Sequence, residues 1–233
     1  MEGFARKLAT FLPPLRAADY TTLFRRIQRL DLSLKATPEL LADDVVIAVD
    51  STGVKVTNRG EWMREKWRVR RGWIKVHAMI DVETNQFLGL EITDESVQDD
   101  WMFTSLLDQV QQQCGEEHPV HRVLGDGAYD RNEIFTTLEQ RKFLSGIKTR
   151  VNAATHSTGF PYRAECVRDR IRLGGCRMWS WITTYGMRWK IEGNFSSFKR
   201  ISGEEVRATS PEGMFCEIRM KGNAYNMLMA MGA

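Results

Sequence analysis

Long apolar runs are missing from this 233-residue chain. No stretch approaches the roughly 18 consecutive apolar residues that suggest a membrane-spanning helix. The N-terminus also lacks the apolar region and small-residue cleavage site of a signal peptide. Both absences argue against a membrane or secreted protein, so we expect a cytoplasmic one. With 42% hydrophobic residues, the chain can still bury the core of one large domain.

Cysteine is scarce and scattered. The four cysteines form no C-x-x-C pair and lie far apart, at Cys114, Cys166, Cys176 and Cys216. This spacing argues against a zinc ribbon. A chain of this size seldom needs disulfides in a cytoplasmic setting, so we expect reduced cysteines in or near the core.

Neither sign of charge dominates the chain as a whole, because the formal net charge is only +3. Its distribution is uneven, however. Residues 141–207 hold 14 lysines and arginines against 5 acids, and residues 55–75 hold 8 against 2. Basic clusters of this kind attract polyanions, nucleic acid first among them. Charge alone leaves a simpler alternative open, in which both segments are basic loops facing water.

Hydrophobic periodicity divides the chain into two parts. Apolar residues at helical spacing predict a helix over 20–30, with prolines on either side. After residue 40, apolar and alternating runs predict strands, with helices between and after them. The expected strands are 45–50, 73–82, 86–93, 121–126 and 143–148, and the expected helices are 99–113, 130–142, one around Glu192 and one from Ser210 to Gly232. We therefore expect a helical segment over 1–40 and an α/β domain over 41–233.

Two aspartates end apolar strands. Asp50 closes VVIAVD and Asp126 closes HRVLGD. A carboxylate at the end of a buried strand is costly unless it leaves the core or meets a cation. Either aspartate alone is also explained as a turn or helix cap. Two of them on central strands make a shared site the stronger hypothesis.

A polar stripe in YGMRWKIEGNFSSFKR gives a third carboxylate. On a helix, Tyr185, Arg188, Glu192 and Lys199 project in nearly the same direction, along the border of an apolar face. An exposed stripe of ion pairs is the alternative, but the glycines at 186 and 193 suit such a helix poorly.

Three convergent carboxylates with adjacent cations suit divalent metal chemistry. Hard oxygen ligands select Mg²⁺ or Mn²⁺. Two such ions can activate a water or a 3′-hydroxyl and stabilise the departing oxygen in phosphoryl transfer. In this interpretation Glu192 binds metal, Arg188 forks onto a phosphate and Lys199 acts as a point charge.

The same residues carry a family resemblance. The spacing Tyr185-(2)-Arg188-(3)-Glu192-(6)-Lys199 resembles the Y-R-E-K signature of insertion-sequence transposases of the DDE type, found in bacteria and archaea. AVDSTGVKV is similar to the family's first-aspartate motif and LGDGAYD to its second, which points to Asp126. WIKVHAMID and EITDESVQDD also resemble the stretches between these motifs. The resemblance covers about residues 45 to 231.

The resemblance implies an RNase H-like fold: a mixed five-stranded sheet flanked by helices, with acids on the first strand, the fourth strand and a late helix. It implies a prokaryotic, nucleoid-associated enzyme that cuts double-stranded DNA at inverted terminal repeats and joins the ends to target DNA, as a homodimer. Asp50, Asp126 and Glu192 would bind two Mg²⁺ or Mn²⁺ ions. We expect DNA contacts from Tyr185, Arg188, Lys199, Arg200, Lys75 and Arg68.

Other features lead to open expectations. Fewer residues precede the first strand than in most family members, which suggests a truncated copy or one part of an element split between reading frames. Residues 160–179 are expected to form a β-rich insert against DNA, and His77 is interpreted as structural or close to DNA. Two alternative functions remain: a metal-dependent nuclease that stops at hydrolysis, and an inactive DNA-binding remnant.

Overall fold

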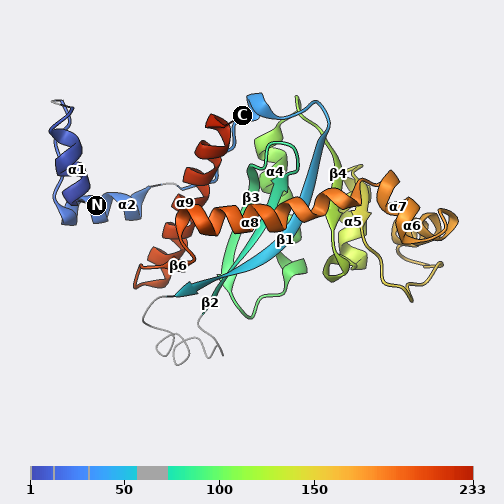
Figure 1. The fold of residues 1–233 in the computed structure, drawn as a ribbon. Helices are drawn as coiled ribbons and strands as arrows, with labels where there is room; N and C mark the ends of the chain where they lie inside the picture. The colour runs from blue at the N-terminus through green and yellow to red at the C-terminus, as the bar shows by residue number, and fades with distance from the viewer. Residues whose placement is uncertain (1, 13, 31, 57–72, 233) are drawn as a thin grey trace.

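The computed structural model describes residues 2–12, 14–30, 32–56 and 73–232. Arg68, one of the expected DNA contacts, lies outside these residues. At the N-terminus, α1 (Glu2–Ala9) and α2 (Tyr20–Arg29) are helical as expected, and Asp19 caps α2 by accepting the Thr22 N–H at 2.8 Å. Figure 1 shows both helices on the far side of α9, away from the sheet.

A mixed sheet forms the centre of the molecule. Its main strands are β1 (Val45–Val56), β2 (Trp73–Asp81), β3 (Phe87–Asp94), β4 (Val120–Gly125) and β5 (Leu144–Ile147), in the order β3-β2-β1-β4-β5. The first three strands are antiparallel, whereas β4 and β5 run parallel to β1. A two-residue strand, β6 (Glu205–Val206), pairs with the end of β1 and makes the sheet six-stranded. The expected five-stranded RNase H-like arrangement is thus confirmed, with one short addition.

Strand β1 is six residues longer than its apolar run predicts. Beyond Asp50 it continues to pair with β2, as far as Lys55 opposite Trp73. The sequence Asp50-Ser51-Thr52-Gly53 has the composition of a turn, yet pairing on the β2 side keeps it extended. Asp50 therefore lies within a long central strand rather than at its end.

Helices cover both faces of the sheet. On one face lie η2 (Asp99–Met102), α4 (Phe103–Cys114), η3 (Gly127–Tyr129) and α5 (Asn132–Gln140), and on the other lie α8 (Trp189–Ser202) and α9 (Pro211–Met231). Figure 1 shows α8 crossing its face of the sheet lengthwise. The α4 helix packs closely on β3 at Gly89. A Cβ at this position would lie only 2.8 Å from the Leu106 carbonyl oxygen, so glycine permits the close contact.

Residues 160–179 are helical, so the expected β-rich insert is wrong. The segment forms α6 (Pro161–Arg172) and the start of α7 (Cys176–Ile182). Pro161 suits the first turn of α6, and Ala164, Val167 and Arg170 recur on its buried face. The Arg170 guanidinium donates to the carbonyls of residues 149 and 150, so part of the basic excess has a structural role. After α7 comes the short η4 (Tyr185–Arg188).

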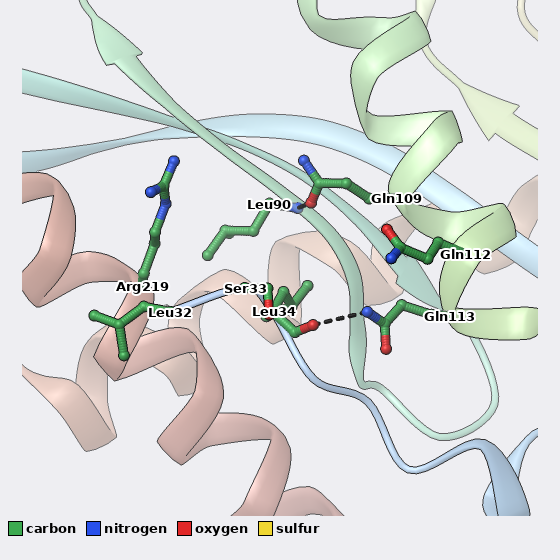
Figure 2. A pocket seen from close by; sticks show the side chains of 8 residues that line it. All are labelled: Leu32, Ser33, Leu34, Leu90, Gln109, Gln112, Gln113 and Arg219. Carbon is green, nitrogen blue, oxygen red and sulfur yellow. Dashed lines mark hydrogen bonds between the residues drawn. The ribbon is translucent and has the colours of Figure 1, made fainter. Parts of the chain in front are cut away.

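Amide side chains tie residues 33–37 to the domain, just before η1 (Pro38–Leu40). The backbone of this segment is hydrogen-bonded by four amide side chains, those of Asn223, Asn226, Gln113 and Gln86. Figure 2 shows one of these bonds, from Gln113 to the Leu34 carbonyl, beside a small cavity of about 230 Å³. The segment is therefore bound through its backbone, much as a peptide is bound.

Candidate active site

Asp50 lies on β1, on the face covered by α8. Its Oδ1 accepts the Ser51 N–H at 2.8 Å, and its side chain is 26% exposed. Burial raises the pKa of Asp50; the Ser51 N–H and Arg188 oppose this, while the charges of Asp126 and Asp99 add to it. The site is therefore rich in negative charge, and a cation would relieve the repulsion.

Asp126 follows β4 next to Asp50. Ala48 pairs with Leu124 in the parallel β1–β4 register, and each aspartate lies two residues further along the chain, Asp50 within β1 and Asp126 just after β4. Neighbouring strands are about 4.8 Å apart, so the two carboxylates come from adjacent positions. Asp126 also caps η3, because its Oδ1 accepts the Ala128 N–H at 2.8 Å. The cap role and a shared site are therefore compatible.

Arg188 connects the sheet to α8. Its Nη1 lies 3.2 Å from Asp50 Oδ2 and its Nη2 lies 2.5 Å from Glu192 Oε1. Burial alone would lower the pKa of Arg188, but Glu192, Tyr185 and Asp50 raise it above the usual value, so the guanidinium is charged. A cation thus already lies between two of the three expected metal ligands.

Tyr185 and Lys199 flank this ion-pair bridge. The Tyr185 ring packs on Trp179, with ring centroids 5.1 Å apart, and burial raises its pKa, with Arg188 opposing the rise and the charges of Asp126 and Asp50 adding to it. Lys199 donates to Thr52 Oγ1 at 2.7 Å, two residues beyond Asp50 on β1. The stripe expected on one continuous helix is instead divided between η4 and α8; Arg188 contacts Asp50 and Glu192, and Lys199 contacts β1 at Thr52.

Two other expected DNA contacts lie elsewhere. Arg200 is exposed and lines a groove of about 360 Å³ between α8 and α9, together with Trp189 and Met229. Lys75 is on β2, where its ammonium contacts Asp99 at 2.8 Å and the Val97 carbonyl at 2.9 Å. Their contact with DNA stays a prediction.

Asp99 is a residue that the sequence interpretation missed. It lies in η2 near Asp50, and its charge acts on that carboxyl. Burial would raise the pKa of Asp99, but hydrogen bonds from His77, Lys75 and Ser51 outweigh burial and lower it. The only sequence signal was the acidic ending of EITDESVQDD, which turn chemistry also explains.

The donor set fits divalent metal ions. Three carboxylates supply hard oxygen ligands, the Asp50–Asp126 repulsion favours a cation, and Arg188 already provides one between Asp50 and Glu192. Within the described residues, no three acidic, histidine or cysteine side chains are grouped closely enough to hold a metal. The Arg188 guanidinium lies between the carboxylates of Asp50 and Glu192, and its position is consistent with the distance between these two acids.

The strand order, with carboxylates on β1, after β4 and on a late helix, defines an RNase H-like protein. A family model described as a transposase DDE domain matches residues 41–227, and another with the same description matches residues 1–59. The chain belongs to this transposase DDE domain family, whose members generally use divalent metal ions.

Among solved structures, the chain is similar to the piggyBac transposase in a cryo-EM structure of its synaptic complex with hairpin DNA. The identity is 8% and the TM-score 0.38, over 82% of this chain and 49% of that one, so the chain spans about half the length of that transposase chain. None of the helices in the described parts of the chain is long and apolar enough to cross a bilayer.

Proposed function

We propose that this protein is a DNA transposase that cleaves the ends of its insertion sequence and joins the 3′ ends to target DNA. The family match over residues 41–227 supports the class. The observation that supports the chemistry is the placement of the acids: Asp50 on β1 and Asp126 just after β4 follow a paired position of these neighbouring strands, and Arg188 joins Asp50 to Glu192.

Asp50, Asp126 and Glu192 would hold two Mg²⁺ or Mn²⁺ ions, which supply activation of a water or 3′-hydroxyl and stabilisation of the leaving oxygen. Arg188 bridges the carboxylates of Asp50 and Glu192. If these acids held metal, its planar fork would be free to bind a phosphate. Arg188 is thus proposed to exchange carboxylates for DNA.

The remaining residues of the stripe position the DNA. Lys199 donates to Thr52, two residues beyond Asp50 on β1, where its ammonium would act as a point charge on the DNA backbone. Tyr185 is fixed by Trp179 and presents its hydroxyl near Arg188. Both side chains are preorganised by contacts in the folded protein, which reduces the cost of ordering them on DNA.

Exposed cations extend the proposed interface along the sheet edge. Lys148 and Arg150 are exposed and follow β5, whose end lies beside that of β4 because Lys148 N–H donates to the Gly125 carbonyl at 3.0 Å. Arg177 is exposed on α7. These groups suit the phosphates of double-stranded DNA on either side of the cut. We also propose a homodimer on DNA, because joining requires two ends held together.

A strand-transfer assay tests the function. The substrate is DNA from either side of the reading frame, cut to leave a 3′-OH, with a supercoiled plasmid as target and Mg²⁺ or Mn²⁺ added. We expect joined products from the wild type and none from Glu192→Gln, which keeps the size of the side chain and removes its charge. Light scattering of the protein–DNA complex measures whether two protomers are present.

Other outcomes of the assay identify the alternatives. Metal-dependent nicking without joining indicates a nuclease rather than a transposase. An inactive DNA-binding remnant gives no product with either metal, and its DNA affinity is unchanged in Asp50→Asn. Either result contradicts the proposed function.

A further inference from the structure

A buried polar network lies on the opposite face of β1 from α8. Ser51 follows Asp50 and pairs across the sheet with His77 on β2. Asp99 Oδ1 lies 2.8 Å from Lys75 Nζ and 3.4 Å from His77 Nδ1. Asp99 thus lies against two side chains of β2, one of which pairs with Ser51 on β1.

The partners of Asp99 are themselves fixed. His77 is fully buried, and its Nε2 lies 2.9 Å from Thr93 Oγ1. Lys75 also donates to the Val97 carbonyl at 2.9 Å. These contacts fix the Asp99 carboxylate on the other side of β1, directly behind Asp50. If Asp99 only linked η2 to β2, its contact with Lys75 would be sufficient.

Tyr129 adds an independent observation. It is 1% exposed, and its hydroxyl is buried without a hydrogen-bond partner among the residues that the structure describes. The ring packs against Phe103, with centroids 6.0 Å apart, and would touch a Cβ at Gly125, just before Asp126. Burial raises the pKa of Tyr129 first, and the charges of Asp99, Asp50 and Asp126 raise it further. A buried phenol without a partner calls for an explanation, and a bound ion or its hydration shell supplies one.

We propose that Asp99 and Tyr129 are positioning residues of the divalent cation site. Asp99 contributes negative charge behind Asp50. It contacts His77, which pairs with Ser51, and the Ser51 N–H donates to the Asp50 carboxylate. Tyr129 offers its hydroxyl to the hydrated cation or to a carboxylate that has bound it. This inference rests on the proposed function, since it assigns further residues to the same site. Partners of this kind, behind the direct ligands, commonly tune metal affinity.

Direct binding of Mn²⁺ to the full chain, followed by electron paramagnetic resonance of the free ion, tests Asp99. We expect Asp99→Asn to weaken Mn²⁺ binding about tenfold, and Asp99→Glu to recover most of the affinity. The matched control is Asp108→Asn, which removes the same charge on the outer side of α4, where Asp108 pairs with Arg141. If Asp99→Asn binds Mn²⁺ as tightly as the wild type does, the proposed role of Asp99 is wrong.

Tyr129→Phe tests the hydroxyl separately, and remains informative if Asp99→Asn folds poorly. Because the hydroxyl has no partner in the metal-free protein, we expect an equal or higher melting temperature without metal, together with weaker Mn²⁺ binding. A lower metal-free melting temperature with unchanged Mn²⁺ affinity overturns the inference. Failure of the metal site itself is distinguishable: the wild type would then bind no Mn²⁺, or Asp50→Asn would leave its affinity unchanged, and the inference would fall with it. Failure of strand transfer alone, with Mn²⁺ binding intact, leaves the inference standing.

Discussion

Arg188 Nη1 lies 3.2 Å from Asp50 Oδ2, although the two residues are 138 positions apart in the chain. This contact joins the central strand β1 to the entry of α8. Because the same guanidinium also contacts Glu192, it fixes the relative positions of two proposed metal ligands. This part of the candidate site is therefore organised around an internal cation, the Arg188 guanidinium.

Replacing Arg188 by alanine tests this organisation. Without metal, we expect the free energy of unfolding to fall by about 1–2 kcal/mol, because Asp50 keeps its burial and its repulsion from Asp126 but loses its counterion. Added Mg²⁺ should then stabilise the variant more than the wild type, since metal replaces the missing charge. Urea unfolding with and without Mg²⁺ measures both effects, and equal Mg²⁺ stabilisation of the two proteins would count against the bridge.

Lys199→Gln should weaken DNA binding without altering its sequence preference. Loss of one phosphate contact lowers the slope of log affinity against log salt by about 1. Fluorescence anisotropy over a range of salt concentrations gives this slope. Lys142→Gln, which removes an exposed charge beyond the end of α5, is the matched control and should leave the slope unchanged.

Much of the fold could be predicted from local sequence patterns. Apolar runs and alternation located the main strands because burial imposes those periods directly. Asp50 and Asp126 stood out because each interrupts an apolar strand. The prediction of a β-rich insert over residues 160–179 is wrong. The frequent arginines of this segment obscure the helical periodicity, in which buried positions recur every three residues. Two of those arginines, Arg163 and Arg170, bind Asp130 and loop carbonyls, and composition gives no sign of this.

The contacts of Asp99 and of residues 33–37 could not be predicted, for a different reason. Asp99 meets Lys75 and His77 only after three strands pair and η2 packs on them. Asn226 meets Lys35 across 191 positions in the chain. No periodic pattern marks an amide that binds a distant backbone, so such pairs appear only in the folded molecule.

Asn226→Ala tests the anchoring of residues 33–37. Asn226 is 1% exposed and hydrogen-bonds the N–H and carbonyl of Phe87 as well as the Lys35 carbonyl. We expect a loss of about 2–4 kcal/mol, because buried backbone groups are left unpaired. Asn223→Ala, at a more exposed position on the same helix, should cost about 1 kcal/mol or less. Chemical denaturation compares the two, and equal losses would contradict the anchoring role of Asn226.

Tyr162 links stability to alkaline pH. Burial raises its pKa from the usual 10.0 to about 12. Between these values the unfolded chain has lost the phenol proton and the folded chain retains it, so stability falls as pH rises through this range. Tyr162→Phe should lose less stability between pH 9 and pH 11 than the wild type.

The same variant has an expected cost at neutral pH. The Tyr162 hydroxyl accepts the Ser145 N–H at 3.0 Å and donates to the Phe143 carbonyl at 3.2 Å. Loss of these bonds should lower stability by about 1–2 kcal/mol. Urea unfolding at pH 7, 9 and 11 separates the two effects, and parallel pH dependence in both proteins would refute the assignment to Tyr162.

Iron-directed cleavage of the protein itself gives the most direct measurement of the shared site. Fe²⁺ substituted for Mg²⁺, with ascorbate and peroxide, cuts the backbone beside the bound ion, and mass spectrometry locates the cuts. We predict cuts near residues 50, 126 and 192 together, all suppressed by excess Mg²⁺ and by Asp50→Asn. Cuts that leave out any one of these three segments would contradict a shared metal site built from Asp50, Asp126 and Glu192.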